Sequence, residues 1–345
     1  MRRGGGTGAA GPRASGRRVT PAAAVGVPRR RPAWVRPCLL LSAAAVSGCE
    51  LEQITVVDVE DVPIAEVYVE IDPAEGAPEV LALLHRTVGH PGDTVRFSGA
   101  RITLSRDDGL VLELDEAPID NCGDSVLDDG SGTCFEADPE QTPALRPGDV
   151  LEVEILLPGG GTLSGATRVP GTFALQGVEQ GQGATCRLPA DTHMEVRWTR
   201  SDGAWAYVNE TSIHDLPAAL AREGIEMDDD PLYLLGLSVS ADDTTIVFPR
   251  EFGLFNRFEL DQEVALRLQV GLPAETLAEI TITAVDRNYV NWARGGSFNP
   301  SGQVRVPSLR GDGTGVFAST VVRRVVATVG PQGLVPVPCP FLDPD

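Results

Sequence analysis

Apolar and polar residues alternate with a period of two along much of the chain from residue 63 to residue 170. In the segment 151–157 aliphatic residues occupy every second position, and Glu152 and Glu154 lie between them. Successive side chains of a strand point to opposite faces, so this pattern predicts antiparallel strands with one dry face. Further segments of this kind are 67–71, 80–83, 100–104 and 110–114. Turn-forming sequences at 107–109 and 158–160 separate them. We therefore predict a small β-sandwich domain over 63–170.

The alternation resumes after a glycine-rich segment at 171–190. Segments 194–198 and 280–284 carry it, and the long apolar segment 315–329 predicts a central strand. The segment 263–270 is also expected to be a strand, with Val264, Leu266, Leu268 and Val270 on one face. We predict a second β-sandwich domain over 171–345, and hence an all-β protein of two Ig-like sandwich domains.

One short helix is expected at 215–224, within "DLPAALAREG". Asp215 is the predicted N-cap and Pro217 lies in the first turn. Leu216 and Leu220 are four residues apart and share a helical face. Gly224 is the predicted stop.

The first 48 residues contain nine Arg and no acidic residue, followed by an apolar run from Cys38 to Val46. This run is shorter than the roughly 20 residues that span a bilayer, and small residues follow it, as in a secretory signal peptide. We predict that 1–48 is such a signal peptide. Because 1–26 is of low complexity, translation is expected to begin near Val27.

The sequence Val46-Ser47-Gly48-Cys49 resembles the lipobox of bacterial lipoproteins. The resemblance implies cleavage before Cys49, lipidation of its thiol and acylation of the new amino end. Several acyl chains on one residue anchor a protein stably to a membrane. The alternative is an ordinary Cys49 behind an uncleaved leader. If Cys49 is lipidated, as we predict, residues 49–62 are a lipidated tether, and the absence of Asp after Cys49 favours the outer membrane.

Lysine is absent, so all 28 basic residues are Arg. This excludes a Walker A loop, an S-x-x-K nucleophile and a Schiff-base lysine, which all need that amine. Removing the nine leader arginines leaves 19 Arg against 49 acidic residues, a net charge of −30 over 297 residues. Such a charge argues against nucleic acid, whose binding depends on phosphate contacts from basic groups.

Of six cysteines, four remain after Cys38 leaves with the leader and Cys49 is lipidated. An even number in an exported chain indicates two disulfides, with three possible connectivities. We predict Cys122–Cys134, which would close a turn-rich loop, and Cys186–Cys339, which would hold the proline-rich C-terminal segment. A zinc site is the rival interpretation, and the absence of C-x-x-C spacing argues against it.

Few residues suggest other chemistry, and we predict no cofactor and no catalytic residues. No H-E-x-x-H or G-x-S-x-G sequence occurs. His85 and His90 are either a metal pair or ordinary surface histidines. The acidic loop that holds Asp124, Asp128 and Asp129 is either a calcium site or a solvated loop, and its spacing does not match an EF-hand.

Aromatic residues concentrate in the second half of the chain. Trp198 fits the dry face of a strand and is expected in the core. Tyr289 and Trp292 stand among Asn288, Asn291 and Arg294 and are expected to be more exposed. They are the candidate ligand-binding surface.

The order of several sequences resembles a family of uncharacterised bacterial lipoproteins. These sequences are "SGARITLSRDDG", "LRPGDVLEVEILLPGGGTLSGATRVPG", "VRWTRSDGAWAYV", "AVDRNYVNW" and "GDGTGVFAS". Members begin with a carboxypeptidase-regulatory-like β-sandwich and are often encoded beside TonB-dependent outer-membrane receptors. The resemblance covers most of 63–330 and implies two β domains, an envelope location and a TonB-dependent receptor as candidate partner. It supplies no catalytic residues, and this chain departs from it in its long leader and in the insertion between Cys122 and Cys134.

These observations predict a non-enzymatic, lipid-anchored protein of the cell envelope that serves as an accessory or binding subunit. Two alternatives remain open. One is a stand-alone structural or adhesion lipoprotein, and the other is an enzyme that acts on envelope polymers.

Overall fold

The computed structural model describes residues 61–73, 76–87, 97–123, 132–176, 185–238, 240–251, 262–294 and 305–330. The chain divides into two compact units, Met1–Val57 and Asp58–Asp345, and every described residue belongs to the second. The predictions for Cys49, His90, Cys339 and the calcium candidates Asp124, Asp128 and Asp129 fall outside the described residues.

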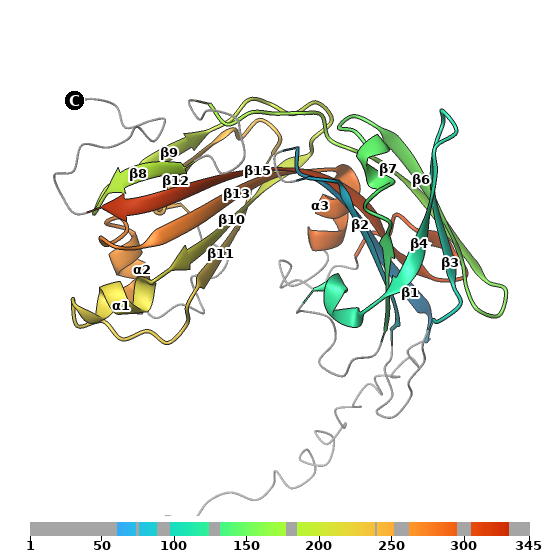
Figure 1. The fold of residues 1–345 in the computed structure, drawn as a ribbon, viewed down its shortest axis with the longest axis horizontal. Coiled ribbons are helices and arrows are strands. Elements are labelled where there is room, and N and C mark those ends of the chain that lie inside the picture. The colour runs from blue at the N-terminus through green and yellow to red at the C-terminus, as the bar shows by residue number, and fades with distance from the viewer. Residues whose placement is uncertain are drawn as a thin grey trace, which may run out of the picture. The chain divides into compact units, whose positions relative to one another are not determined.

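Most of the described chain is β-structure (Figure 1). The strands are β1 (Pro63–Ile71), β2 (Glu79–Arg86), β3 (Arg101–Arg106), β4 (Val111–Ala117), β5 (Thr133–Ala137), β6 (Val150–Leu156), β7 (Thr162–Arg168), β8 (Thr185–Pro189), β9 (Met194–Arg197), β10 (Ala206–His214), β11 (Leu232–Leu237), β12 (Thr245–Phe248), β13 (Leu277–Val285), β14 (Arg310–Gly311) and β15 (Thr314–Gly330). The helices are α1 (Leu216–Ala221), α2 (Gln262–Leu268) and α3 (Arg287–Arg294), with short 3-10 turns η1 (Ile119–Cys122) and η2 (Thr142–Ala144). The predicted all-β fold is confirmed.

Thirteen strands form one hydrogen-bonded sheet, in the order β11-β10-β13-β15-β1-β2-β5-β4-β3-β6-β7-β14, with β8 also paired to β15. β15 is its longest strand and lies between β13 and β1, as Figure 1 shows. It runs antiparallel to β13 and parallel to β1. The predicted central strand at 315–329 is thus confirmed. The boundary between residues 170 and 171 stays a prediction, and β15 joins strands from both sides of it.

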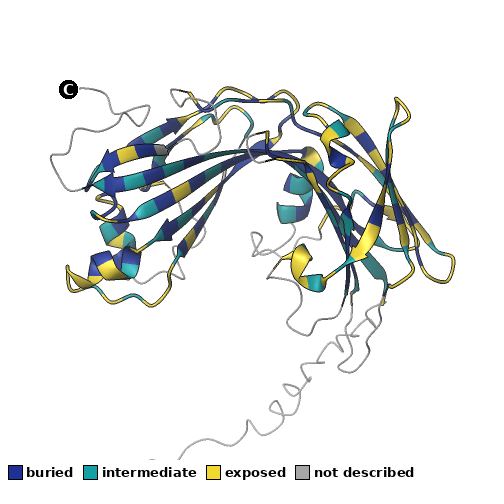
Figure 2. Cartoon of the chain, viewed as in Figure 1, coloured by how far each residue is buried: buried dark blue, intermediate teal, exposed yellow. Residues whose placement is uncertain are grey.

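The predicted alternation is visible along the strands in Figure 2. In β6, Leu151, Val153 and Ile155 are buried while Glu152 and Glu154 are exposed. The apolar face of β6 belongs to one core, to which strands β1 to β5 and β7 also contribute buried side chains. Each fully buried aliphatic side chain contributes roughly 1.5–3 kcal/mol to such a sandwich.

A second, two-stranded sheet of β9 and β12 supplies the opposing layer near β10 and β13. Met194 and Trp198 are buried, as their alternation predicted, and Phe248 of β12 is fully buried. The Trp198 ring contacts Tyr207 of β10 edge to face, with centroids 5.2 Å apart. The core face of β10 therefore packs, at Tyr207, against the residue that follows β9.

Helix α1 confirms the one predicted helix. Leu216 and Leu220 are both fully buried, and Gly224 has the left-handed φ of +83° expected of a stop. Asp215 is the N-cap residue, but its side chain forms no capping bond. Its own backbone N–H donates to Asp230 Oδ1 at 3.0 Å instead.

The prediction of a strand at 263–270 is wrong, because this segment forms α2. Val264 and Leu268 are buried, whereas Leu266 and Val270 are 55% and 54% exposed. Burial therefore follows the helical spacing of four residues and not the period of two. The segment is also rich in Glu, Ala, Leu, Arg and Gln, which are strong helix formers.

A third helix, α3, follows β13 directly and was not predicted. Asp286 precedes it and accepts a hydrogen bond from the Tyr289 N–H at 2.8 Å, as a capping carboxylate does. Its other oxygen accepts from the Thr167 hydroxyl at 2.6 Å, and Thr167 lies 2.8 Å from the Ser319 hydroxyl. This buried network joins α3 to β7 and β15.

The outer edge of β7 is covered by the segment around β14. Arg310 and Gly311 pair with Ser164 and Leu163. Asp312 exchanges two hydrogen bonds with Thr162, each 2.8 Å long. A side-chain amide of α3 completes the cover, because Asn288 Nδ2 donates to the Ala166 carbonyl at 2.8 Å.

The disulfide Cys122–Cys134 is confirmed, and it fastens η1 to β5. Cys186 is also disulfide-bonded. Its predicted partner, Cys339, lies outside the described residues, so that pairing stays a prediction.

Candidate functional site

The large sheet has a second face, turned away from the core, which we call the open face. It carries the alternate residues of β11, β10, β13, β15 and β1. The register places Glu210 of β10 opposite Thr281 of β13, and Thr281 opposite Arg324 of β15. Polar side chains thus form a row across neighbouring strands on this face.

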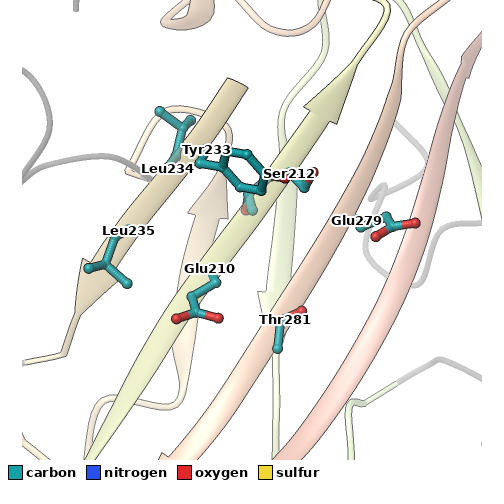
Figure 3. Close-up of a pocket in the computed structure, with 8 residues that line it drawn as sticks. Glu210, Ser212, Tyr233, Leu234, Leu235, Glu279 and Thr281 are labelled. Carbon is teal, nitrogen blue, oxygen red and sulfur yellow. The ribbon is translucent and has the colours of Figure 1, made fainter. Parts of the chain in front are cut away.

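A pocket of about 360 Å³ lies on the open face over β10, β11 and β13 (Figure 3). Glu210 and Thr281 lie beside each other in it, and Tyr233 and Leu235 stand on the side of β11. Tyr233 is 68% exposed, so one aromatic face is free to contact a ligand. The complete lining is Glu210, Thr211, Ser212, Tyr233, Leu234, Leu235, Glu279 and Thr281.

Two carboxylates give the pocket its charge. Ser212 pairs with Glu279 and Glu210 with Thr281, so the two glutamates are diagonal neighbours, about 7 Å apart at Cβ. Within the described part of the chain, neither glutamate forms an ion pair. The nearby Arg324 is already engaged, because it donates to Asp72 and, at 3.3 Å, to Glu70.

Burial raises the pKa of Glu210, and the positive charge of Arg324 opposes the rise. Burial likewise raises the pKa of Glu70, against the opposing charge of Arg324. The charge of Arg324 therefore does not fully offset the desolvation of these two carboxylates. A cation brought to Glu210 would stabilise its charged form.

The predicted ligand residues Tyr289 and Trp292 lie on α3, which packs on the open face against β15. The expectation that both are exposed is wrong, since Trp292 is only 8% exposed and Tyr289 is partly buried. Arg305 covers the Trp292 ring at 4.7 Å from its centroid. The helical backbone turns both rings toward the sheet. Ligand binding by this pair stays a prediction, without an exposed aromatic face to support it.

Tyr289 nevertheless lies close to the pocket. Tyr289 and the pocket residue Leu235 both pack against one small buried cluster, which includes Val208 and Val290. Burial raises the pKa of Tyr289 to about 12, and the charges of Glu210 and Glu70 add to the rise. Its hydroxyl therefore stays protonated at neutral pH and remains a hydrogen-bond donor.

Strand β11 is the last strand on its side of the sheet, and its only described strand partner is β10. The Ser238 N–H donates to the Tyr207 carbonyl at 2.8 Å, which makes 207 and 238 a hydrogen-bonded pair. Such pairs alternate along an antiparallel ladder. Leu234 and Gly236 therefore turn their backbone groups toward β10, and Tyr233 and Leu235 turn theirs outward.

Other candidates find no support as metal sites. Among the described residues, no group of three or more His, Cys, Asp or Glu is arranged to hold a metal ion. His85 lies 3.5 Å from Glu66 on the open face. His193 contacts the Gln269 carbonyl at 2.8 Å. The imidazoles of His85 and His193 therefore contact neighbouring protein groups, and these contacts account for their positions without a metal ion.

The pocket residues Glu210, Glu279 and Tyr233 were not predicted. Each lies at a polar or exposed position of a strand, which by itself only indicates a solvated face. Their grouping depends on β10 pairing with both β11 and β13. A run of alternating residues does not state which strands are neighbours.

Comparison with known proteins gives no family. No family model matches the chain, and no curated protein matches it. Several solved structures resemble it weakly, among them these two. One is a DUF4785 family protein from Legionella pneumophila, with a TM-score of 0.20, 10% identity and coverage of 63% of this chain and 51% of that one. This chain thus spans about half the length of that relative.

The other structure is DIP-gamma IG1+IG2, with a TM-score of 0.18, 8% identity and coverage of 79% of this chain and 99% of that one. Such low similarity says nothing about function. No helix among the described residues is both long and apolar enough to cross a membrane.

Proposed function

We propose that this protein is lipid-anchored in the bacterial cell envelope and serves there as a non-enzymatic binding or accessory subunit. The observation that carries the anchoring is the sequence Val46-Ser47-Gly48-Cys49 behind a basic, apolar leader. The lipids on Cys49 would hold the protein at the outer membrane, and 50–62 would link them to β1.

The pocket supports the binding role. Binding sites are concave, partly apolar and contain a few converging polar groups, and the pocket on the open face has this character. It combines an exposed Tyr233 with two carboxylates that lack a described ion pair. A TonB-dependent receptor of the outer membrane is the candidate partner.

Lipid attachment is tested by growing cells with an alkyne-tagged palmitate and reading the tag on the purified chain. We expect labelling of the native chain and of Cys38→Ser, and loss of labelling in Cys49→Ser. Cys38 is the matched control, because it is a cysteine of the leader that the proposal leaves without lipid. Equal labelling of both variants would overturn the anchoring.

The accessory role is tested by purifying the tagged full chain from native membranes in a gentle detergent, followed by mass spectrometry. We expect an outer-membrane receptor in near-equal amount. A solitary chain would reject the receptor and favour a structural or adhesion role.

A further inference from the structure

We propose that the outer edge of β11 and the adjacent pocket bind an extended segment of a partner protein that carries a lysine or arginine. The segment adds to the sheet as a strand beside β11, and its basic side chain enters the pocket toward Glu210. This inference rests on the proposed binding role and specifies the partner's chemistry.

The backbone of β11 provides the first half of the argument. Tyr233 and Leu235 point their N–H and C=O groups away from β10, at the end of the sheet. Among the described residues, neither Tyr233 nor Leu235 has a further backbone hydrogen-bond partner. Unpaired groups on an edge strand are a template for another strand, which is how several peptide-binding domains recognise their ligands.

The side chains provide the second half. Alternate residues of an added strand would point to the open face, where Tyr233 and Leu235 already stand. Neighbouring strands are about 4.8 Å apart, so the added strand would lie about 10 Å from β10. A lysine or arginine side chain crossing over β11 can meet the Glu210 carboxylate at this distance.

Each part of such a side chain finds a suitable contact. The methylene stem would pack on Leu235, and the cation would pass the Tyr233 ring, which attracts positive charge. Glu210 would form the ion pair, and Glu279 would add negative potential from β13. Arg324 does not compete, because Glu70 and Asp72 already hold it.

Charge also decides between a partner and a second copy of this chain. The protein has a net charge of −21, and two β11 edges would bring two such pockets together. Like charges placed in one interface disfavour association. A basic segment is attracted by the same field.

The test uses the full chain in detergent and a fluorescein-labelled, capped heptapeptide of alternating threonine and valine with lysine at its centre. Binding is read by fluorescence anisotropy. We expect Glu210→Gln to weaken binding by about two- to fivefold, as for a partly exposed ion pair. Replacing the central lysine by glutamine should weaken it similarly. Glu154→Gln, an exposed strand glutamate of β6, is the matched control and should change nothing.

The strand pairing has its own controls. N-methylation of alternate peptide nitrogens removes the donors to β11 and should abolish binding. Tyr233→Pro removes an outward N–H together with the ring, while Tyr233→Ala removes the ring alone, so the proline variant should bind more weakly.

Four results would overturn the inference. The first is that the lysine heptapeptide does not bind. The second is that the glutamine and N-methylated peptides bind as tightly as the lysine heptapeptide, and the third is that N-acetyl-lysine methylamide, which has no strand to add, binds as tightly as it does. The fourth is that the chain forms dimers that pair through β11. None of them alters the labelling of Cys49, so failure here is distinct from failure of the anchoring proposal.

Discussion

The two ends of the large sheet differ in how their edges are treated. At one end β14, Asp312 and Asn288 occupy the outer backbone groups of β7. At the other end no described residue pairs with the outward backbone groups of Tyr233 and Leu235 in β11. Proteins usually block sheet edges, since open edges pair with other chains. The covered edge therefore follows the common solution, and the open edge is the place where we propose that a partner segment pairs.

Glycines show how closely the covered edge is packed. A Cβ on Gly165 of β7 would lie 2.6 Å from the Ser308 carbonyl oxygen. A Cβ on Gly236 of β11 would find no atom nearer than 3.7 Å. The covered edge thus depends on the absence of side chains, and the open edge does not.

The largest effect should come from Gly311→Ala. Gly311 has a φ of +136°, and a Cβ there would lie 2.1 Å from the Thr162 carbonyl oxygen. We expect a loss of about 3–5 kcal/mol in the free energy of unfolding, measured in urea. Gly236→Ala is the control and should change it by no more than about 1 kcal/mol, since Ala suits a strand better than Gly. Equal losses would remove the difference between the two edges.

Proline substitutions test the orientation of β11. Leu234→Pro removes an N–H that donates to β10 together with a side chain that is only 2% exposed, and should cost about 3 kcal/mol or more beyond the loss in Leu234→Ala. Tyr233→Pro removes an outward N–H, which edge strands tolerate, and should cost less than about 1 kcal/mol. Thermal unfolding of the two variants compares them directly. The reverse order would mean that Tyr233 faces β10.

Asp286→Ala should destabilise the chain by about 2–3 kcal/mol, because it removes the cap of α3 and leaves Thr167 without its acceptor. Asp286→Asn should cost under about 1 kcal/mol, since an amide oxygen still accepts from the helix. Burial raises the pKa of Asp286, so losing its charge brings a compensating gain. Urea unfolding measures both variants, and equal losses would show that the charge itself is needed.

The smallest effect concerns the pocket. Because burial raises the pKa of Glu210, its charged form opposes folding at neutral pH. Glu210→Gln should therefore raise Tm by about 1–2 °C. The value is modest because the pocket walls desolvate the carboxylate only in part, and the rest of the side chain is exposed to solvent that screens its charge. The gain should vanish as pH falls below the ordinary value of 4.5, where the carboxyl is protonated in both states.

Differential scanning calorimetry from neutral to acidic pH checks this. Glu154→Gln, on an exposed strand position far along the sheet order, should show no such pH-dependent gain. A lower Tm for Glu210→Gln at neutral pH would mean that its charge stabilises the fold and is not held free for a ligand.

Period-two alternation predicted most of the strands, because a strand with one buried face has apolar residues at every second position. The burial of Leu151, Val153 and Ile155 is an example. The same rule failed at α2, where Val264 and Leu268 satisfy both a strand and a helix. The exposure of Leu266 and Val270 separates the two possibilities, and the helix-forming composition of the segment was the signal in the sequence that pointed the same way.

The candidate site was beyond sequence reasoning for a different reason. Glu210 and Glu279 are brought together by strand pairing between segments almost seventy residues apart. Tyr289 was singled out for exposure that α3 does not allow, yet it packs against the same buried cluster as the pocket residue Leu235. The sequence could show that Tyr289 is an aromatic residue among polar ones. Its burial and its neighbours depend on how α3 packs on the sheet and on which strands pair.

The parallel pairing of β1 with β15 has a mechanical consequence. β1 is the first described strand, and its partners run from Thr314 to Val321. A pull along β1 from its amino end would load these hydrogen bonds in shear, so that they resist together and do not open one after another. If the lipids that we propose on Cys49 hold the chain by its amino end, flow past the membrane would apply force in this direction. The hydrogen bonds between β1 and β15 would then carry the mechanical load on the fold.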